Sequence, residues 1–311
     1  MTNHQNEQGL RRWWIYQKER FPLAQHGPVI FAFSFSAVAF SWMLHSSNGW
    51  PSLASIVVAF VTCLLFFFQL RISDEFKDKE EDARYRPYRP VPRGLVTLRE
   101  LVVLFVLCSI VQIGLALWLD PRLLILLLIT WSYQALMGKE FFIGKWLRGK
   151  HLTYLITHMA IMPLVDLYAT GTEWLLSLGH APDGLFWFLL ASLFNGMGID
   201  IGRKIRSPED EEIGVPTYSV VWGRPKALMI WWTVMGLALI CTCIAAHRID
   251  FFLPILFILS VTLGGAIVVG IYFLRQQTKG AGKWIELYSG AWTLVLYMSL
   301  GLLPLIWREL I

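Results

Sequence analysis

Long apolar segments alternate with short polar ones along most of the chain. Many of these segments approach or exceed the ~20 residues that a helix needs to cross a bilayer. They are unbroken rather than short and alternating, which favours helices over strands. The pattern therefore predicts an all-α integral membrane protein with about nine transmembrane helices. The expected spans are residues 29–46, 51–72, 99–118, 122–138, 152–170, 184–199, 226–246, 251–274 and 286–306.

The chain outside these spans is short. Residues 1–28 are polar and basic, and within them residues 11–22 mix basic with aromatic side chains. That mixture is typical of a helix at the membrane interface, and a solvated tail is the alternative. We therefore expect a cytoplasmic or interfacial N-terminal segment over 1–28, one membrane domain over 29–306 and a short tail over 307–311.

Composition supports a bilayer protein. The 311 residues are 56% hydrophobic and only 16% charged, whereas a soluble domain averages about a quarter charged residues. All four cysteines lie inside predicted spans and lack the spacing of a metal site. We expect them to be small buried side chains rather than disulfide partners. They are Cys63, Cys108, Cys241 and Cys243.

The distribution of basic residues predicts the orientation in the membrane. With a cytoplasmic N-terminus and nine spans, 24 of the 27 Lys and Arg residues fall on the cytoplasmic side. This agrees with the positive-inside rule and puts the C-terminus on the opposite side. Because the membrane accounts for the basic excess, we expect membrane lipid and no nucleic acid among the partners.

Two acidic segments, 73–82 and 207–212, then lie on the same side. In the first, Asp74, Asp78 and Asp82 are spaced four residues apart, and each such step turns a helix by only ~40°. Carboxylates on one helix face repel one another. Either nearby Lys and Arg residues offset this charge on a solvated helix end, or a divalent cation does. Mg²⁺ usually takes one or two carboxylates together with waters and substrate phosphates.

Prolines and arginines follow the first acidic segment. Pro87 predicts the end of the helix, since the residue before a proline avoids the α conformation. The segment YRPYRPVPRG then presents Arg86, Arg89 and Arg93 close to the carboxylates. Carboxylates for a metal, beside arginines for phosphates, are typical of a phosphate-ester site.

The stretch DEFKDKEEDARYRPYRPVPRGLVTLREL resembles the first signature of the UbiA superfamily of intramembrane prenyltransferases. That signature is N-D-x-x-D-x-x-x-D, then a basic stretch and R-P-[IVL]-P-x-G. Asp74 stands where the family usually has Asn, and Glu75 takes the next Asp position. Asp78 and Asp82 match the remaining two. The resemblance covers roughly residues 20–306 and implies helices around a central cavity capped by cytoplasmic loops.

The second acidic segment departs from the family pattern. Its ending, EEIGVPTYSVVWG, is similar to the family's K-x-G-x-x-[ST]-x-x-x-x-x-G. Counted back from Gly214, the second Asp of the family's D-x-x-x-D falls on Asp210 and the first falls on Arg206. The alternative for this segment is a solvated helix start, with Ser207 as the cap and Pro208 in the first turn.

The resemblance implies Mg²⁺, usually as two ions, and a set of site residues. The expected metal ligands are Asp74, Asp78, Asp82 and Asp210, with Glu209 or Asp200 as substitutes for the missing acid. The expected diphosphate contacts are Lys150 (in GKHLT, which resembles the family's K-R-x-T), Arg89, Arg71, Arg20 and, just before the second acidic segment, Arg203, Lys204 and Arg206. The expected cavity residues are Asn195, Asp200, His158, Asp166 and Glu75.

His158 and Asp166 lie eight residues apart in one expected span, roughly on one face. Polar residues inside a membrane usually mark function. The two side chains could deprotonate an acceptor or a terminal cation, or they could pair across helices.

The implied activity is Mg²⁺-dependent ionisation of an isoprenyl diphosphate and transfer of the prenyl group to an aromatic or alcohol acceptor. A UbiA-type terpene cyclase, which cyclises the prenyl cation without an acceptor, is the first alternative. A membrane transporter is an alternative of another class, but it would carry its acids near the bilayer midplane. A non-catalytic relative also remains open, because the second motif departs from the pattern.

Overall fold

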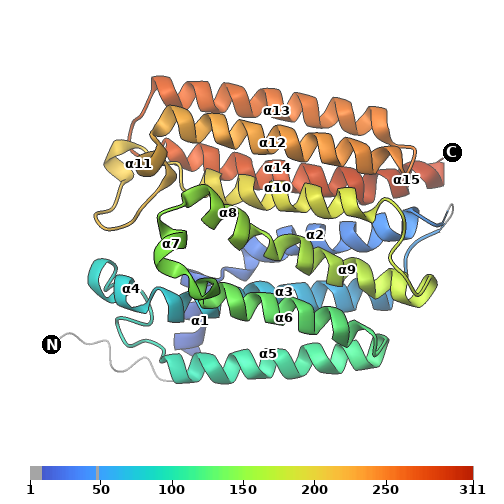
Figure 1. Ribbon diagram of the computed structural model, residues 1–311, viewed down its shortest axis with the longest axis horizontal. Coiled ribbons are helices and arrows are strands. Elements are labelled where there is room, and N and C mark those ends of the chain that lie inside the picture. The colour runs from blue at the N-terminus through green and yellow to red at the C-terminus, as the bar shows by residue number, and fades with distance from the viewer. Residues whose placement is uncertain (1–8, 47–48, 311) are drawn as a thin grey trace.

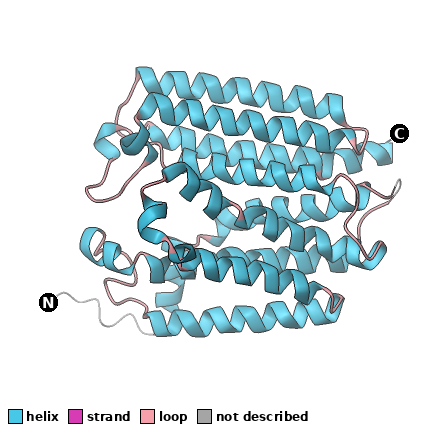
Figure 2. Ribbon diagram, viewed as in Figure 1, coloured by secondary structure: helices cyan, strands magenta, loops and turns pink. Residues whose placement is uncertain are grey.

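The computed structural model describes residues 9–46 and 49–310, and these residues form helices and loops with no strand (Figures 1 and 2). The first half of the chain forms α1 (Leu10–Arg20), α2 (Leu23–Met43), α3 (Leu53–Lys77), α4 (Lys79–Tyr85), α5 (Leu98–Leu119), α6 (Leu123–Gly138) and the 3₁₀ turn η2 (Glu140–Phe142). The second half forms α7 (Gly144–Arg148), α8 (His151–Met159), α9 (Ile161–Ser177), α10 (Leu185–Arg203), η3 (Pro208–Asp210), α11 (Tyr218–Trp222), α12 (Arg224–His247), α13 (Phe252–Arg275), α14 (Gly282–Leu300) and α15 (Leu302–Leu310).

Within the described residues, eight helical segments are long and apolar enough to cross a membrane. They are α2, α3, α5, α8 with α9, α10, α12, α13, and α14 with α15. The expected span at 122–138 corresponds to α6, which has only 16 residues and is shorter than a typical spanning helix. The all-helical membrane fold is therefore confirmed. Within the described residues, eight segments are long enough to span a membrane, and the shorter α6 coincides with the remaining expected span.

The long helices lie side by side in one bundle (Figure 1). The short helices α1, α4, α7 and α11 gather at one end, and the turns α2–α3, α5–α6 and α9–α10 lie at the other. Both acidic segments are at the end that carries the short helices, as the sequence predicts. We call this the loop end of the bundle.

The expected fifth span is broken into two helices. α8 ends at Met159 and α9 begins at Ile161. Pro163 explains the break, because it has no N–H to bond the carbonyl of Met159 four residues earlier. His158 and Asp166 therefore lie on either side of this break, within one candidate span from His151 to Ser177. The expectation that they share one face stays a prediction.

Both predicted domain boundaries fall inside helices. The N-terminal segment forms α1, whose Tyr16 is buried against Ile72 and Leu101 of the bundle. The next helix begins at Leu23, before the expected boundary at residue 28. At the other end, α15 runs through residues 302–310, and Arg308 donates to the carbonyls of Ser46 and Ile249 at 2.8 and 3.2 Å. The two ends thus pack on the bundle, and residues 1–8 and 311 lie outside the described chain.

Buried side chains fill the space between α2, α10 and α14. The rings of Phe40 and Phe188 stack with centroids 5.0 Å apart, and Phe188 also meets Tyr297 edge-on. Aromatic rings thus pack together in this part of the bundle. All four cysteines are buried and unpaired, as expected.

Candidate functional site

The two acidic segments meet at the loop end of the bundle. Glu212 accepts from Arg206 at 3.2 Å in its own segment, and it lies 3.5 Å from Arg86 in the other. Gly214 lies so close to the Tyr85 ring that a Cβ at this position would overlap it. The segment after α3 and the segment after α10 therefore form one continuous surface.

The first acidic segment is nearly one helix. α3 ends at Lys77, and α4 begins at Lys79. Across this junction the backbone N–H of Asp78 still bonds the Asp74 carbonyl at 2.9 Å, and Asp82 bonds Asp78 at 2.8 Å. The three aspartates thus keep their one-turn spacing. α4 then ends at Tyr85, two residues before Pro87, which agrees with the predicted helix end.

Of the three aspartates in this motif, Asp78 has the least compensation. Among the described residues, its side chain has neither a hydrogen bond nor an ion pair. Burial is the main cause that raises the pKa of Asp78 to about 6, and the charge of Asp74 raises it further, while Lys77 opposes the change. Asp74 is 46% exposed and receives a single weak ion pair from Arg71 at 3.3 Å. This pair of carboxylates carries unneutralised negative charge.

The other two acids of this motif are already engaged by arginines. Asp82 is buried and accepts two hydrogen bonds from Arg89, at 2.8 and 2.6 Å. Glu75 is also buried and is paired with Arg20 of α1. Arg89 and Arg20 are expected diphosphate contacts, and here they hold carboxylates instead. The expected metal-ligand role of Asp82, the cavity role of Glu75 and the diphosphate contacts of Arg89 and Arg20 remain predictions.

The end of α10 carries the second charged group of the site. Asp200 is buried and accepts from Arg203 and Lys204, both at 2.9 Å, and from the Tyr218 hydroxyl at 2.9 Å. Burial, together with the charge of Asp200, raises the pKa of the Tyr218 hydroxyl well above its usual range, so this hydroxyl remains a donor. The side chain of Arg203 is 49% exposed. Asp200 therefore holds two cations at the loop end of the bundle.

The second acidic segment serves mainly to hold loops together. Asp210 Oδ2 accepts from the Gly280 N–H at 2.6 Å and so ties this segment to the turn before α14. Arg206, where the family has its first Asp, lies against the Asp210 carbonyl at 3.4 Å. Glu209 is exposed. The hydrogen bond from Gly280 could not be predicted from the sequence, because that residue is seventy positions away and has no side chain.

The first motif has a donor set suited to one magnesium ion. Asp74 and Asp78 offer hard oxygen ligands one turn apart, and Mg²⁺ is typically held by one or two carboxylates and completes its shell with water and phosphate. The uncompensated Asp78 carboxylate is an independent sign that a cation belongs there. Within residues 9–46 and 49–310, no three His, Cys, Asp or Glu side chains converge on one point. A second ion at Asp210 stays a prediction, and Arg206 in place of the family's first Asp leaves that site one carboxylate short.

A cluster that the sequence did not reveal lies beside these aspartates. Lys77 contacts the Tyr154 hydroxyl and, at 3.0 Å, His158 Nε2. Glu140 Oε1 lies 3.7 Å from the same ammonium. Lys77 stands inside the first motif, but nothing in its spacing predicts partners from α8 and from the turn after α6. Lys150, an expected diphosphate contact at the start of α8, is exposed.

Asp166 and Asn195 belong to a separate polar cluster in the bundle. Asp166 is fully buried and accepts from Tyr297 at 3.2 Å, and Tyr297 also contacts Ser192 at 3.2 Å. Asn195 accepts from Thr293 at 3.2 Å. One oxygen of Asp166 and the amide nitrogen of Asn195 are buried with no described hydrogen-bond partner. Asp166 and His158 thus both pair across helices, but with different partners.

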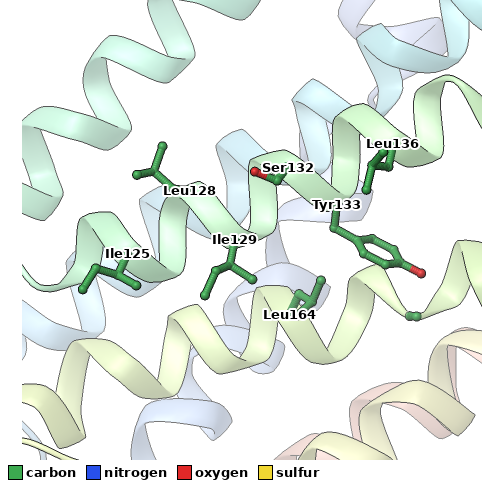
Figure 3. Close-up of a pocket in the computed structure, with 8 residues that line it drawn as sticks. Ile125, Leu128, Ile129, Ser132, Tyr133, Leu136 and Leu164 are labelled. Atoms are coloured by element: carbon green, nitrogen blue, oxygen red, sulfur yellow. The ribbon is translucent and has the colours of Figure 1, made fainter. Parts of the chain in front are cut away.

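Two hollows in the described structure differ in polarity. An open apolar groove of about 620 Å³ runs between α6 and α9, lined by Ile125, Leu128, Ile129, Ser132, Tyr133, Leu136, Ala160 and Leu164 (Figure 3). A polar pocket of about 260 Å³ lies at the loop end, lined by Arg203, Ile205, Arg206, Asp210, Glu212, Gly282, Lys283 and Glu286. The first suits a hydrocarbon chain, and the second lies beside the cations of α10.

Comparison with solved structures supports the fold. A UbiA homologue from Aeropyrum pernix K1 superimposes with a TM-score of 0.65 at 15% identity, covering 91% of this chain and 98% of that one. A digeranylgeranylglyceryl phosphate synthase gives 0.62 at 16% identity, covering 95% and 99%. A UbiA homologue from Archaeoglobus fulgidus, bound to DMAPP and Mg²⁺, gives 0.56 at 12% identity, covering 93% and 99%.

Sequence comparison supports the same assignment. A 4-hydroxybenzoate octaprenyltransferase of Vibrio atlanticus (strain LGP32) is 23% identical over 191 residues, which are 60% of this chain and 63% of that enzyme. The alignment thus spans somewhat less than two thirds of that relative. The UbiA prenyltransferase family matches residues 32–290. Since this match covers most of the chain and the first motif lies within it, the protein belongs to the UbiA prenyltransferase family.

Proposed function

We propose that this protein ionises an isoprenyl diphosphate with the help of Mg²⁺ and transfers the prenyl group to an acceptor inside the membrane. The observation that carries the proposal is the uncompensated pair Asp74 and Asp78, which lies at the loop end together with the cations that Asp200 orients. The charge of Arg203 on α10 acts on Asp74 of α3. A diphosphate bound together with Mg²⁺ would neutralise both the two aspartates and the cations of α10.

The residues of the chain have distinct tasks in this proposal. Asp74 and Asp78 would hold the ion, which when bound supplies charge neutralisation for the leaving diphosphate. Arg203 and Lys204 would contact the diphosphate oxygens directly, as charge-assisted hydrogen bonds of this kind are strong. Their common partner, Asp200, keeps them in place. These direct contacts from α10 would neutralise the part of the diphosphate charge that a second metal ion neutralises in the usual family pattern.

The hydrocarbon part of the substrate would lie against the groove between α6 and α9. Its lining is almost wholly apolar, and the hydroxyl of Tyr133 at one end is already bonded to the Thr157 carbonyl at 2.7 Å. An apolar groove open to lipid suits an isoprenoid chain. The positive-inside rule favours a cytoplasmic loop end, so the diphosphate would enter from the cytoplasm.

The fate of the prenyl cation distinguishes two versions of the proposal. A transferase passes the cation to an aromatic or alcohol acceptor, and the Vibrio relative is named for an aromatic one. A cyclase would need aromatic walls and a final base. The buried Asp166 beside Tyr297 and Phe188 is the observation that keeps the cyclase as the second candidate.

One experiment tests the proposal. Purified protein is incubated with geranyl, farnesyl or geranylgeranyl diphosphate and Mg²⁺, with and without 4-hydroxybenzoate, and the released diphosphate and the prenyl products are identified. Transfer predicts a prenylated acceptor, and cyclisation predicts a cyclic hydrocarbon without any acceptor. Absence of diphosphate release with all three substrates would contradict the enzyme proposal and would favour the transporter or a non-catalytic relative.

A further inference from the structure

A lysine inside the first acidic motif is held from a distant part of the chain. Lys77 precedes Asp78, and its side chain is only 15% exposed. Its ammonium donates to the Tyr154 hydroxyl and, at 3.0 Å, to His158 Nε2. A free lysine side chain has large rotamer entropy, so an ordered one needs several partners. Both of these partners come from α8.

The protonation of His158 follows from its contacts. Nδ1 lies 2.9 Å from the Tyr154 carbonyl oxygen, which can only accept a hydrogen bond. Nδ1 therefore carries the proton, and Nε2 is the bare nitrogen that accepts from Lys77. The rings of Tyr154 and His158 stack with centroids 3.8 Å apart, and the ammonium lies 4.8 Å from the Tyr154 ring. These neutral groups orient the ammonium without cancelling its charge.

The positive charge of Lys77 is only partly neutralised. An ammonium has three donors, and two of them are used by Tyr154 and His158. Glu140 is 3.7 Å away, beyond hydrogen-bond distance, and it is itself bonded by Arg148 at 3.0 and 3.1 Å. One N–H and much of the charge are therefore left for another anion.

The turn that supplies Glu140 is conformationally costly. Glu140, Phe141 and Phe142 all have φ between 48° and 60°, in the left-handed region. Non-glycine residues there cost about 1–3 kcal/mol each and persist only where the surroundings enforce them, often at functional sites. This turn is the element that brings Glu140 to Lys77.

Lys77 also occupies the junction between the two halves of the site. The charges of both Lys77 and Lys204 act on His158. The neighbouring Tyr154 is within the electrostatic reach of Asp74, Asp78 and Asp200. The ammonium thus belongs to a charged group that includes both the proposed metal ligands and the cations of α10.

We propose that Lys77 is a further diphosphate-binding residue, and that His158, Tyr154 and Glu140 are the residues that position it. This inference rests on the proposed function. A fixed ammonium beside one magnesium ion supplies positive charge at the phosphate group. It offers a physical reason why the second motif can carry Arg206 in place of an acid.

Direct binding tests the assignment, with inorganic diphosphate and Mg²⁺ as the probe and calorimetry as the measurement. Lys77→Met is compared with Lys79→Met, a matched control, since Lys79 is exposed and has no contact with the cluster. Loss of a charge-assisted hydrogen bond predicts about ten- to hundredfold weaker binding for Lys77→Met. Lys79→Met should stay within about twofold, because the structure gives Lys79 no role. Equal affinities for the two variants would overturn the proposal.

Two further measurements guard against a misfolded variant. Lys77→Gln keeps a donor for His158 without the charge, and it should lose affinity as Lys77→Met does; wild-type affinity would count against the proposal. In the unmodified protein, bound magnesium diphosphate should protect Lys77, more than Lys79, from an amine-acylating reagent followed by mass spectrometry. Equal labelling with and without the probe would count against it as well.

The outcomes separate this inference from the proposed function. If diphosphate binds in a Lys77-dependent way but no prenyl diphosphate is cleaved, the proposed reaction fails and the Lys77 assignment holds. If cleavage occurs but Lys77→Met binds diphosphate like Lys79→Met, the proposed reaction holds and the Lys77 assignment fails. A protein that binds no diphosphate in the presence of Mg²⁺ would contradict both.

Discussion

At the scale of single residues, Asp78 distinguishes a binding site from a charged surface. Its neighbours one turn away each have an arginine, Arg71 for Asp74 and Arg89 for Asp82. Asp78 has no such partner among the described residues, although it is half-buried. An ionised carboxylate placed between two others is destabilising unless a ligand compensates for it.

Asp78→Asn should therefore stabilise the ligand-free protein. Loss of the Asp78 charge removes its repulsion from Asp74 and Asp82, which predicts a gain of about 0.5–1 kcal/mol in unfolding free energy. The same change should abolish the stabilisation that Mg²⁺ gives to the wild type. Thermal unfolding in detergent, with EDTA or with Mg²⁺, measures both effects, and Glu80→Gln is the control on the exposed side of α4. A destabilised Asp78→Asn with an intact Mg²⁺ response would contradict the site.

Asp210 should behave differently, since its carboxylate accepts from the Gly280 N–H. Asp210→Asn keeps an oxygen that can accept this bond, so it should change stability by less than about 0.5 kcal/mol. It should also keep the response to Mg²⁺. Asp210→Ala, which removes the acceptor, should lose about 1 kcal/mol of stability in the same assay. A lost Mg²⁺ response in Asp210→Asn would show that this residue is a metal ligand after all.

Sequence spacing could identify the aspartates but not their partners. The four-residue repeat and the following prolines are local features, and they correctly predict the helix over Asp74 to Tyr85. Which acids remain free depends on arginines and backbone groups brought close by the fold. The pairing of Asp82 with Arg89 is seven residues apart, but that of Glu75 with Arg20 is fifty-five and that of Asp210 with Gly280 is seventy. No local pattern contains the last two.

At the scale of elements, the two loop segments are held together by packing as well as by charge. The Tyr85 ring at the end of α4 lies against Gly214, whose φ of +78° already favours glycine. Both causes make position 214 intolerant of a side chain. The contact joins the loop after the first acidic segment to the loop after the second, and so fixes the two loops relative to each other.

Gly214→Ala tests this contact, and Gly94→Ala is its matched control. Gly94 has a φ of +79°, but a Cβ added there would have nothing within 4 Å, so the two variants share only the backbone cost. That cost is about 1 kcal/mol, and only Gly214→Ala adds an overlap with Tyr85. We expect faster amide hydrogen exchange over residues 82–90 and 206–216 in Gly214→Ala alone. Equal exchange in both variants would show that the two loops do not depend on this contact.

The membrane helices were largely predictable because long apolar runs are a local signal. The break between α8 and α9 was not predicted, although Pro163 provided a signal for it. The left-handed turn at Glu140 was not predicted either, because none of its residues is a glycine. These irregular elements are the ones that carry Tyr154, His158 and Glu140 to Lys77.

At the scale of the whole molecule, the expected diphosphate contacts other than Lys150 are already paired with carboxylates. The pairs are Arg20 with Glu75, Arg71 with Asp74, Arg89 with Asp82, Arg203 and Lys204 with Asp200, and Arg206 with Glu212. Diphosphate alone would compete with Asp74 for Arg71, and Mg²⁺ alone would compete with Arg71 for Asp74. When both bind, Mg²⁺ frees Arg71 for the diphosphate, and the diphosphate frees Asp74 for Mg²⁺.

Mg²⁺ and inorganic diphosphate should therefore stabilise the protein more together than the sum of their separate effects. A coupling free energy of about 1–3 kcal/mol is typical for such linked sites. The melting temperature with EDTA, with Mg²⁺, with diphosphate in EDTA, and with both ligands provides the comparison. Additive shifts would show that the ion pairs do not exchange partners on binding.

The most direct test of the account is the rate of diphosphate release from a prenyl diphosphate in the presence of Mg²⁺. Asp78→Ala should lower this rate by at least about a hundredfold, because the metal-binding pair is lost. Asp183→Ala changes an exposed acid between α9 and α10, at the opposite end of the bundle, and should leave the rate unchanged. An Asp78→Ala protein that folds and releases diphosphate at the wild-type rate would contradict the assignment of this site.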